Sequence, residues 1–346
     1  MRTKTPFLLP FFISFVISAC GSDDGSANPS GTDGQDLSSV AEPMSSAEGL
    51  SQESSPSVTS SSSVSGSVPA KVEVNVVTEP VATGSAYVCT TQPMTIGSGV
   101  SVTCDGTFAG SISDKEDAAP YDPAAVYTDF VDIRKVYEAR QPGEKLVLLI
   151  RHADRTKSTD KSGILTGLGE LQSKSVGEKI AAGEEPLYFH SEIPRTLQTC
   201  QKIAEGRGQN EIKHVELAEL NGDWFVSDAE KYAAYSESEI TSYYLISGWA
   251  YEGKYADAHY DLATRGKQFV DEVVLAKMAA NADVVVAVSH DQMLVPLLVY
   301  LTNAQIELNY NVAQDWINFL AGVAFVIKAD GTVRYVPVKG LDSGRQ

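Results

Sequence analysis

Two uninterrupted apolar runs, each followed at once by polar residues, constrain the fold more than any other feature of this chain. Residues 145–150 read Lys-Leu-Val-Leu-Leu-Ile, and residues 283–288 read Asp-Val-Val-Val-Ala-Val. Short apolar runs without polar alternation are typical of strands that are buried on both faces, as in a parallel sheet covered by helices. The two runs therefore predict an α/β fold with a largely parallel sheet.

Segments with helical spacing separate the predicted strands. The stretch 165–182 carries a candidate N-cap at Thr166, and the stretch 194–205 begins with a proline in its first turn. This alternation predicts a three-layer sandwich over residues 120–343, in which helices flank a mainly parallel sheet. The pattern further predicts strands at 187–190 and 212–217, helices at 123–139, 229–245, 256–280 and 293–301, and a closing hairpin of 322–327 with 333–338.

Polar side chains follow four of the predicted strands, at the point where each strand ends. Ligands of parallel sheets bind beyond the carboxyl ends of the strands, so we expect these side chains to converge on one rim. Arginines match phosphate oxygens with two parallel hydrogen bonds, and a histidine beside them suits phosphoryl chemistry with a histidine nucleophile. The side chains are those of Arg151, His152, Arg155, Ser191, Arg195, Glu219, His290 and Asp291.

Four short motifs, three of which contain residues of this set, occur in a fixed order over 146–327. They are Arg151-His152-Ala153, Leu165-Thr166-x-x-Gly169-x-x-Gln172, Ser191-x-x-x-Arg195-x-x-Gln198-Thr199 and Ser289-His290. Each motif alone is weak, but their joint order and spacing resemble those of the histidine phosphatase superfamily, which includes phosphoglycerate mutase-like enzymes and histidine acid phosphatases.

The resemblance implies a phosphohistidine mechanism. His152 is expected to attack phosphorus, while Arg151, Arg195 and His290 bind the phosphoryl oxygens and stabilise their charge, with Arg155 as an additional substrate-binding residue. A carboxylic acid is expected to protonate the leaving oxygen and then to deprotonate the attacking water. The resemblance implies no metal and no cofactor, because arginines supply the positive charge.

The identity of the proton donor stays open between two carboxylates. Asp291 follows the second histidine, as in the acid phosphatase and phytase branch, where the corresponding aspartate is the donor. Glu219 resembles the donor of the mutase-like branch, but one residue is missing between it and Gly222. The undisturbed spacing favours Asp291. Ala153 also departs from the family, which has glycine there, and alanine fits if the backbone φ stays negative.

The N-terminus has the features of an export signal. A positive start precedes an apolar run at 7–17, which is too short to span a bilayer as a helix. The sequence Ile17-Ser18-Ala19-Cys20 resembles the lipobox of bacterial lipoproteins, which implies a signal peptide at 1–19 and a lipid anchor on Cys20. An ordinary secretory signal is the alternative. We expect an outer-membrane lipoprotein, on the periplasmic side or at the cell surface.

Two segments separate this signal from the α/β domain. Residues 20–70 are rich in Ser, Gly and Asp and cannot offset their ordering entropy, which predicts a disordered tether. Strand-like runs follow, with alternation at 72–76, and predict a small β element at 71–114. Cys89 and Cys104 are expected to pair across its hairpin, since an exported chain reaches an oxidising compartment. A structural stalk is favoured for this element over a ligand-binding module.

Charge and composition limit the partners. The formal net charge of −18 repels nucleic acid, so a nucleic-acid binder is not expected. The expected partners are a small phosphorylated substrate and, through Cys20, a membrane; the oligomeric state is left open. A tyrosine-rich stretch at 221–262 is expected to line a pocket for a sugar or aryl monoester rather than to neutralise a polyanion such as phytate.

These features predict an extracytoplasmic phosphomonoester hydrolase, a histidine-type phosphatase. Two other functions remain open at this point. A mutase-like phosphotransferase is disfavoured by the export signal, because the substrates of such enzymes are cytoplasmic. A non-catalytic lipoprotein that binds a phosphoryl ligand or a protein on the same fold is disfavoured by the retention of both histidines and both arginines of the motifs.

Overall fold

The structure is a computed structural model that describes residues 69–95, 98–113, 117, 119–157, 161–237 and 241–346. The predicted signal peptide, the lipidation site Cys20 and nearly all of the predicted tether lie outside these residues. The described residues belong to one compact unit, which contains the main sheet and all the helices described below.

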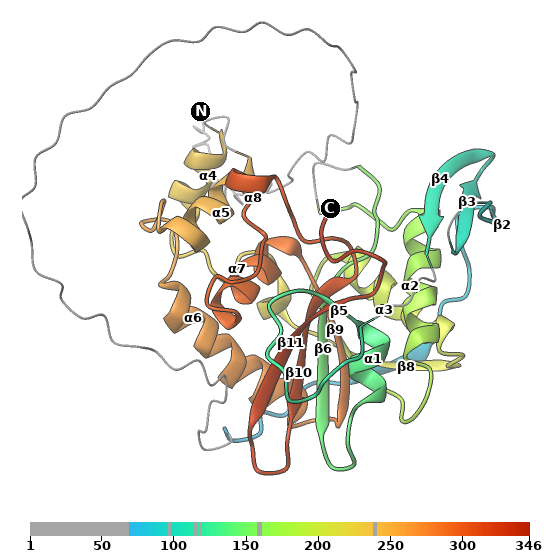
Figure 1. Ribbon diagram of the computed structural model, residues 1–346, viewed down its shortest axis with the longest axis horizontal. Helices are drawn as coiled ribbons and strands as arrows, with labels where there is room; N and C mark the ends of the chain where they lie inside the picture. Colours follow the sequence, from blue (N-terminus) through green and yellow to red (C-terminus); the bar gives the residue numbers. More distant parts are fainter. Residues whose placement is uncertain (1–68, 96–97, 114–116, 118, 158–160, 238–240) are drawn as a thin grey trace, which may run out of the picture. The chain divides into compact units, whose positions relative to one another are not determined.

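Eight strands form the main sheet, in the order β1-β8-β7-β9-β6-β10-β11-β5 (Figure 1). The neighbours β8–β7, β7–β9 and β9–β6 are parallel, whereas β10 pairs antiparallel with both β6 and β11. The prediction of a mainly parallel sheet between helices is confirmed. The strands are β1 (Val77–Pro80), β5 (Val131–Asp132), β6 (Lys145–Arg151), β7 (Leu187–His190), β8 (Glu211–Glu216), β9 (Val284–Ser289), β10 (Ala321–Ile327) and β11 (Val333–Lys339).

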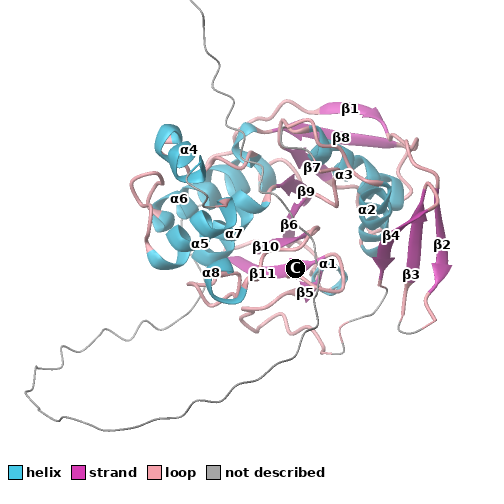
Figure 2. Cartoon of the chain, turned by 90° about the horizontal axis from the view of Figure 1, so that it is seen from above, coloured by secondary structure: helices cyan, strands magenta, loops and turns pink. Residues whose placement is uncertain are grey.

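Helices cover both faces of this sheet (Figure 2). One face carries α1 (Ile133–Glu138), α2 (Gly167–Lys179) and α3 (Pro194–Gly206). The other face carries α5 (Ser242–Glu252), the π-helix η2 (Phe269–Ala279) and α7 (Asp291–Leu301). The remaining short helices are η1 (Ala218–Leu220), α4 (Ala229–Glu237), α6 (Leu262–Gln268) and α8 (Tyr310–Ala313).

Side chains of the apolar run in β6 pack into the hydrophobic cores on both faces of the sheet. Leu146, Leu148 and Ile150 join the core beneath α1–α3, while Val147 and Leu149 join the core on the opposite face. All five side chains are fully buried. A strand in this position has no solvent-facing side, which explains why its sequence lacks polar alternation.

Three predicted helices differ in extent from the observed ones. The segment predicted as a helix at 123–139 is helical only over α1, because Asp132 pairs with β11 and then accepts a hydrogen bond from the Arg134 backbone N–H as the N-cap. The stretch 229–245 is divided between α4 and α5. In the stretch 256–280, helix starts only at α6, where Asp261 caps the first turn.

The small β element is shorter than the predicted 71–114. Residues 72–76 form no strand, and β1 pairs antiparallel with β8 at the edge of the main sheet, so this part of the segment belongs to the α/β domain. The separate sheet consists of β2 (Cys89–Pro93), β3 (Val100–Cys104) and β4 (Thr107–Ile112). The sequence pattern gave no signal for β4, whose Phe108 is 69% exposed.

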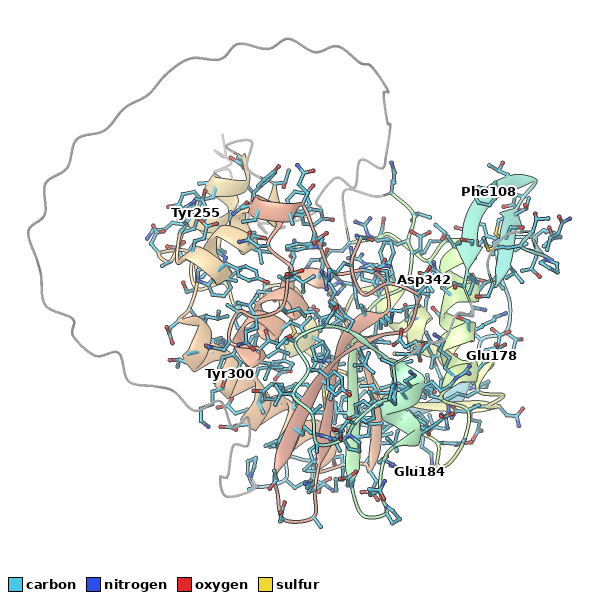
Figure 3. The ribbon with its side chains drawn as sticks, viewed as in Figure 1. Phe108, Glu178, Glu184, Tyr255, Tyr300 and Asp342 are labelled. Carbon is cyan, nitrogen blue, oxygen red and sulfur yellow. A yellow bond between two sulfur atoms is a disulfide. The ribbon has the colours of Figure 1, made fainter. Side chains whose placement is uncertain are left out.

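Cys89 and Cys104 form a disulfide between β2 and β3, visible as the yellow bond in Figure 3. The disulfide lies against the first turn of α2, where a Cβ on Gly167 would come within 2.5 Å of Cys89 Sγ and 2.7 Å of Cys104 Sγ. The Tyr87 hydroxyl donates a hydrogen bond to the Leu165 carbonyl in the same region. The small sheet is therefore packed on the start of α2. Cys200 is free and buried.

Candidate active site

The register of the sheet brings the predicted residues together. Arg151 at the end of β6 pairs with Ser289 at the end of β9, so that His152 and His290 follow on neighbouring strands. The centroids of the two imidazole rings are 5.3 Å apart. β7 ends beside β9, which places Ser191 next to the same rim. The convergence follows from parallel strands of matched length.

His152 is held in one tautomer. Its Nδ1 lies 2.8 Å from the Ala153 carbonyl, which can only accept, so Nδ1 carries the proton and Nε2 keeps its lone pair. Burial, followed by the positive charges of Arg195 and Arg151, lowers the pKa of His152 well below its ordinary value. The imidazole is therefore neutral, as a nucleophile requires.

His290 is also held as a neutral ring. The Arg195 Nη2 group donates to His290 Nδ1 at 3.3 Å, so the proton of His290 sits on Nε2 and is donated to Ser191 Oγ at 2.8 Å. Burial and the nearby Arg195 charge lower the pKa of His290. Ser191 thus orients His290. The motif Ser191-x-x-x-Arg195 supplies hydrogen-bond partners to both nitrogens of the His290 ring.

Arg151 is 1% exposed and is fixed on three sides. Its Nη1 donates to the Ile317 carbonyl at 2.7 Å, and its Nη2 lies 3.0 Å from Asp291 Oδ2. The guanidinium carbon stands 4.3 Å from the centre of the Phe319 ring. These contacts hold the fork of the guanidinium at the strand end before any ligand binds.

Asp291, at the first position of α7, contacts the histidine–arginine cluster. Its Oδ2 accepts a hydrogen bond from Trp316 Nε1 at 3.0 Å besides the ion pair with Arg151. Burial by itself raises the pKa of Asp291, but the Arg151 charge and the Trp316 hydrogen bond together outweigh burial and lower it. In the absence of a ligand Asp291 is thus ionised.

Glu219 is directed elsewhere. It lies in the 3₁₀ turn η1, and its carboxylate forms an ion pair with Lys277 of η2. Asn221 lies beside the start of α3, where its Nδ2 donates to Glu192 Oε2 at 3.0 Å. The contacts of the two candidate acids thus tie Asp291, but not Glu219, to Arg151.

The loop after His152 contains a contact that the sequence gave no reason to expect. Asp154 Oδ2 accepts a hydrogen bond of 2.5 Å from the Thr166 hydroxyl, and the same hydroxyl accepts from the Gly169 N–H as the N-cap of α2. Burial raises the pKa of Asp154.

Arg155 is half-buried on this loop, and its Nη1 donates to the Thr156 carbonyl at 3.1 Å.

The tyrosines of 221–262 pack mainly on one another and on buried rings. Tyr232 is 3% exposed and meets His259 edge-on, and Tyr235 meets Tyr255. Tyr243 lies 4.6 Å from the ring of Trp316, the residue that binds Asp291. The insertion therefore reaches the site through Trp316.

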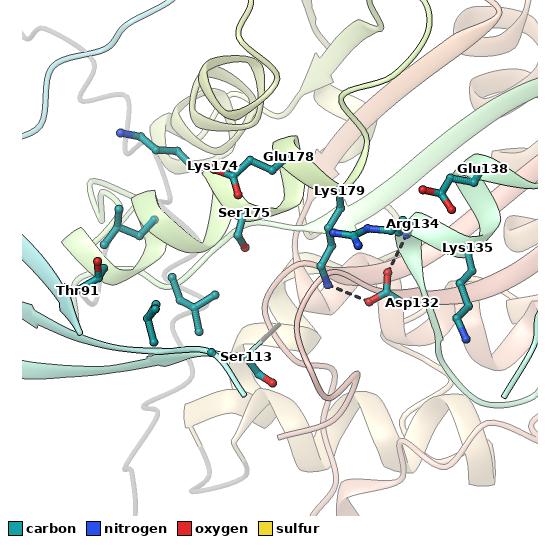
Figure 4. A pocket seen from close by; sticks show the side chains of 14 residues that line it. Thr91, Ser113, Asp132, Arg134, Lys135, Glu138, Lys174, Ser175, Glu178 and Lys179 are labelled. Atoms are coloured by element: carbon teal, nitrogen blue, oxygen red, sulfur yellow. Dashed lines mark hydrogen bonds and ion pairs between the residues drawn. The ribbon is translucent and has the colours of Figure 1, made fainter. Parts of the chain in front are cut away.

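A separate cavity of about 420 Å³ lies between the small sheet and helices α1 and α2 (Figure 4). Its charged side chains are engaged locally: Lys179 Nζ, for example, is 2.9 Å from Asp132 Oδ2. The two histidines and the arginines of the strand ends do not line it. Among the described residues, no cluster of three His, Cys, Asp or Glu side chains could hold a metal ion.

Two histidines and two arginines thus meet at one rim of the sheet, with Arg195 supplied by the first turn of α3. Residues 147–318 match the sequence model of the histidine phosphatase superfamily (branch 1), and this domain belongs to that superfamily. No curated protein matches the chain.

No helix within the described part of the chain is long and apolar enough to cross a membrane.

Several solved structures are similar to the chain at low identity. A mycobacterial glucosyl-3-phosphoglycerate phosphatase is 15% identical, with 57% of this chain and 100% of that chain covered and a TM-score of 0.37. Phosphoglycerate mutase from Bacillus anthracis is 15% identical, with 57% and 93% covered and a TM-score of 0.39. Phosphoserine phosphatase from Entamoeba histolytica is 16% identical, with 55% and 94% covered and a TM-score of 0.37.

Proposed function

We propose that the protein is an exported phosphomonoester hydrolase that forms a phosphohistidine on His152. The observation that supports this most directly is the state of His152: a buried, neutral imidazole whose Nδ1 proton is engaged by the Ala153 carbonyl, leaving the Nε2 lone pair for attack. Around it, Arg151 and Arg195 supply positive charge for the phosphoryl oxygens.

In the first step, His152 Nε2 attacks phosphorus in line and the bond to the leaving oxygen breaks. Arg151, Arg195 and His290 bind the three equatorial oxygens. Asp291 donates a proton to the leaving oxygen. A bound phosphoryl dianion competes for Arg151 and adds negative charge beside Asp291, so binding raises the pKa of this carboxyl and prepares it as the donor.

In the second step, a water molecule attacks the phosphohistidine. The Asp291 carboxylate takes the proton from this water, inorganic phosphate leaves, and neutral His152 is regenerated. The step needs no acceptor besides water, which separates a hydrolase from a mutase. We propose small monoesters with an aryl or sugar leaving group as substrates, because rings of the 221–262 stretch approach the acid through Trp316.

The test uses the full chain, solubilised in detergent, with p-nitrophenyl phosphate from pH 4 to 8. We expect phosphate release, and with a substrate radiolabelled in its phosphoryl group we expect quenching in alkali to trap label on histidine, because the P–N bond of phosphohistidine is stable in alkali and hydrolyses in acid. His152→Ala should abolish both signals. His259→Ala is the matched control, because His259 is also buried and also hydrogen-bonded to a backbone carbonyl, that of Tyr255. Vanadate binding without turnover by the unsubstituted chain would instead support a phosphoryl-binding lipoprotein.

Export and lipid anchoring form a second part of the proposal. The apolar run at 7–17 and the lipobox-like sequence before Cys20 support it, and a disulfide between Cys89 and Cys104 suits an oxidising compartment. In a bacterial host, we expect the chain in the membrane fraction and labelled by a palmitate analogue. Cys20→Ser should remove the label, and label retained by this variant would contradict the proposal.

A further inference from the structure

The segment 316–319 touches three members of the site although no motif marks it. Its Ile317 carbonyl accepts the hydrogen bond from Arg151 Nη1, and its Phe319 ring lies 4.3 Å from the Arg151 guanidinium carbon and 5.8 Å from the His152 ring centroid. Its Trp316 donates to Asp291 Oδ2. One short stretch of chain thus contacts the proposed nucleophile, the phosphate-binding arginine and the acid.

The end of the described chain holds this segment. Trp316 and Gln346 exchange two backbone hydrogen bonds of 3.1 and 2.9 Å, and the Asn318 N–H donates to the Gly344 carbonyl at 2.9 Å. Between them, Ile317 and Arg345 form an antiparallel bridge. Residues 343–346, called here the terminal strap, therefore fix the backbone of 316–318 on the side away from Arg151.

Side-chain contacts hold the terminal strap in turn. Arg345 forms ion pairs with Asp129 at 2.6 Å and with Glu307 at 3.0 Å. Gly344 packs so closely that a Cβ there would lie 2.1 Å from Phe130 Cγ. The strap is thus tied both to the loop before β5 and to the loop after α7.

We infer that Trp316 is a positioning residue for Asp291, and that the terminal strap keeps Trp316 and the Ile317 carbonyl in place. The inference rests on the proposed function, because it takes Asp291 as the proton donor. Oδ2 of Asp291 accepts from both Trp316 Nε1 and Arg151 Nη2, while Oδ1 accepts from the Gln292 N–H at 2.9 Å. The indole therefore fixes the carboxylate plane when a phosphoryl ligand draws Arg151 away.

Several elements set the charge state of Asp291 besides Trp316. Arg151 comes from β6 and His290 from the end of β9, and both act on this carboxylate. Burial and then the negative charge of Asp291 raise the pKa of Tyr232 in α4. Trp316 donates to Asp291 without carrying a charge, so its removal changes the hydrogen bonding of Asp291 without removing a charge.

The experiment compares Trp316→Phe with the unsubstituted chain on an alkyl phosphate, whose leaving group needs a proton. Phenylalanine keeps a ring against Tyr243 but lacks the N–H. We expect kcat to fall about threefold to tenfold with KM within twofold, and the alkaline limb of the kcat–pH profile to move up by about one unit. Trp249→Phe, a buried tryptophan packed on His259, is the control and should leave the profile unchanged.

A second comparison tests the terminal strap. Arg345→Gln should lower kcat, and the loss in Arg345→Gln combined with Trp316→Phe should be smaller than the product of the two single losses, since the strap acts in part through Trp316. Independent, multiplying effects would overturn the role of the strap. An unshifted pH profile in Trp316→Phe, with the unsubstituted chain active and His152→Ala inactive, would overturn the inference and leave the proposed function standing. Inactivity of the unsubstituted chain would contradict the proposed function itself.

Discussion

Arg151 Nη2 lies 3.0 Å from Asp291 Oδ2, and the two side chains are only 2% and 14% exposed. The residue expected to bind the phosphoryl group is thus paired, before substrate arrives, with the residue expected to donate the proton. A buried ion pair contributes little net stability, but removal of one partner leaves the other charge uncompensated. The pair therefore links the stability of the free protein to the occupancy of its site.

We predict that Asp291→Asn lowers the free energy of unfolding by about 3 kcal/mol, because it leaves the Arg151 charge buried without a partner. Inorganic phosphate should recover part of this loss, since the anion can replace the carboxylate beside Arg151. Urea unfolding with and without phosphate measures both effects. Lys277→Met supplies the control: the Lys277–Glu219 pair is about a quarter exposed, and its loss should cost at most about 1 kcal/mol.

With Asp291 as the acid, the effect of its substitution on the phosphorylation rate should depend on the leaving group of the substrate. In Asp291→Asn, the rate of His152 phosphorylation should fall about 10² to 10³-fold with an alkyl phosphate, but less than tenfold with p-nitrophenyl phosphate, whose leaving group departs without a proton. Quenched-flow measurement of the phosphoenzyme gives both rates. Glu219→Gln should show no such difference between substrates. The reverse pattern in the two variants would assign the acid to Glu219.

Much of this site was predictable because its chemistry sits at the ends of strands. The runs before Arg151 and before Ser289 identify β6 and β9 by their lack of polar residues, and parallel pairing then brings His152 and His290 together. Such predictions need only local pattern and one rule of sheet geometry. Residues 77–80, which form β1, fell inside the predicted small β element without being recognised as a strand, because strand pairing over a long sequence separation leaves no local trace.

The rest of the site depends on contacts that no local pattern encodes. None of the sequence motifs contains Trp316, and its hydrogen bond to Asp291 depends on the path of the chain between α8 and β10. Spacing favours Asp291 over Glu219 but does not exclude Glu219. The two differ in their partners, Lys277 and Arg151, which the folded chain supplies.

The contact between the disulfide and α2 predicts whether substitution of Gly167 stabilises or destabilises the fold. Alanine at a helical position normally stabilises by up to about 1 kcal/mol, but at Gly167 its Cβ would overlap the sulfurs of Cys89 and Cys104. Gly167→Ala should therefore destabilise by about 1–3 kcal/mol. Gly84→Ala, where no atom lies within 4 Å of the added Cβ, is the control. In a Cys89→Ala, Cys104→Ala background the Gly167→Ala penalty should shrink; an unchanged penalty would place its cause elsewhere.

The buried histidines predict how stability changes with pH. Burial is the largest cause of a lowered pKa at His152, His190, His259 and His290. Below about pH 6.5 the unfolded chain binds protons at these positions and the folded chain does not, so the free energy of unfolding falls as the pH decreases. Each such histidine contributes at most about 1.4 kcal/mol per pH unit between 6.5 and its folded pKa.

The carboxyl groups Asp154 and Asp291 act differently in this range. The lowered pKa of Asp291 stabilises the fold until the pH approaches the unfolded value near 3.9, so its loss lies below the window from 6.5 to 4.5. The raised pKa of Asp154 lets the folded chain bind a proton first, which offsets part of the histidine effect. Urea unfolding at pH 7.5, 6, 5 and 4.5 should show a steady decrease, and His152→Asn should reduce its slope. Equal stability at pH 7.5 and 5 would mean that these imidazoles bind protons in the folded chain, and with a charged His152 the proposed nucleophile would be absent.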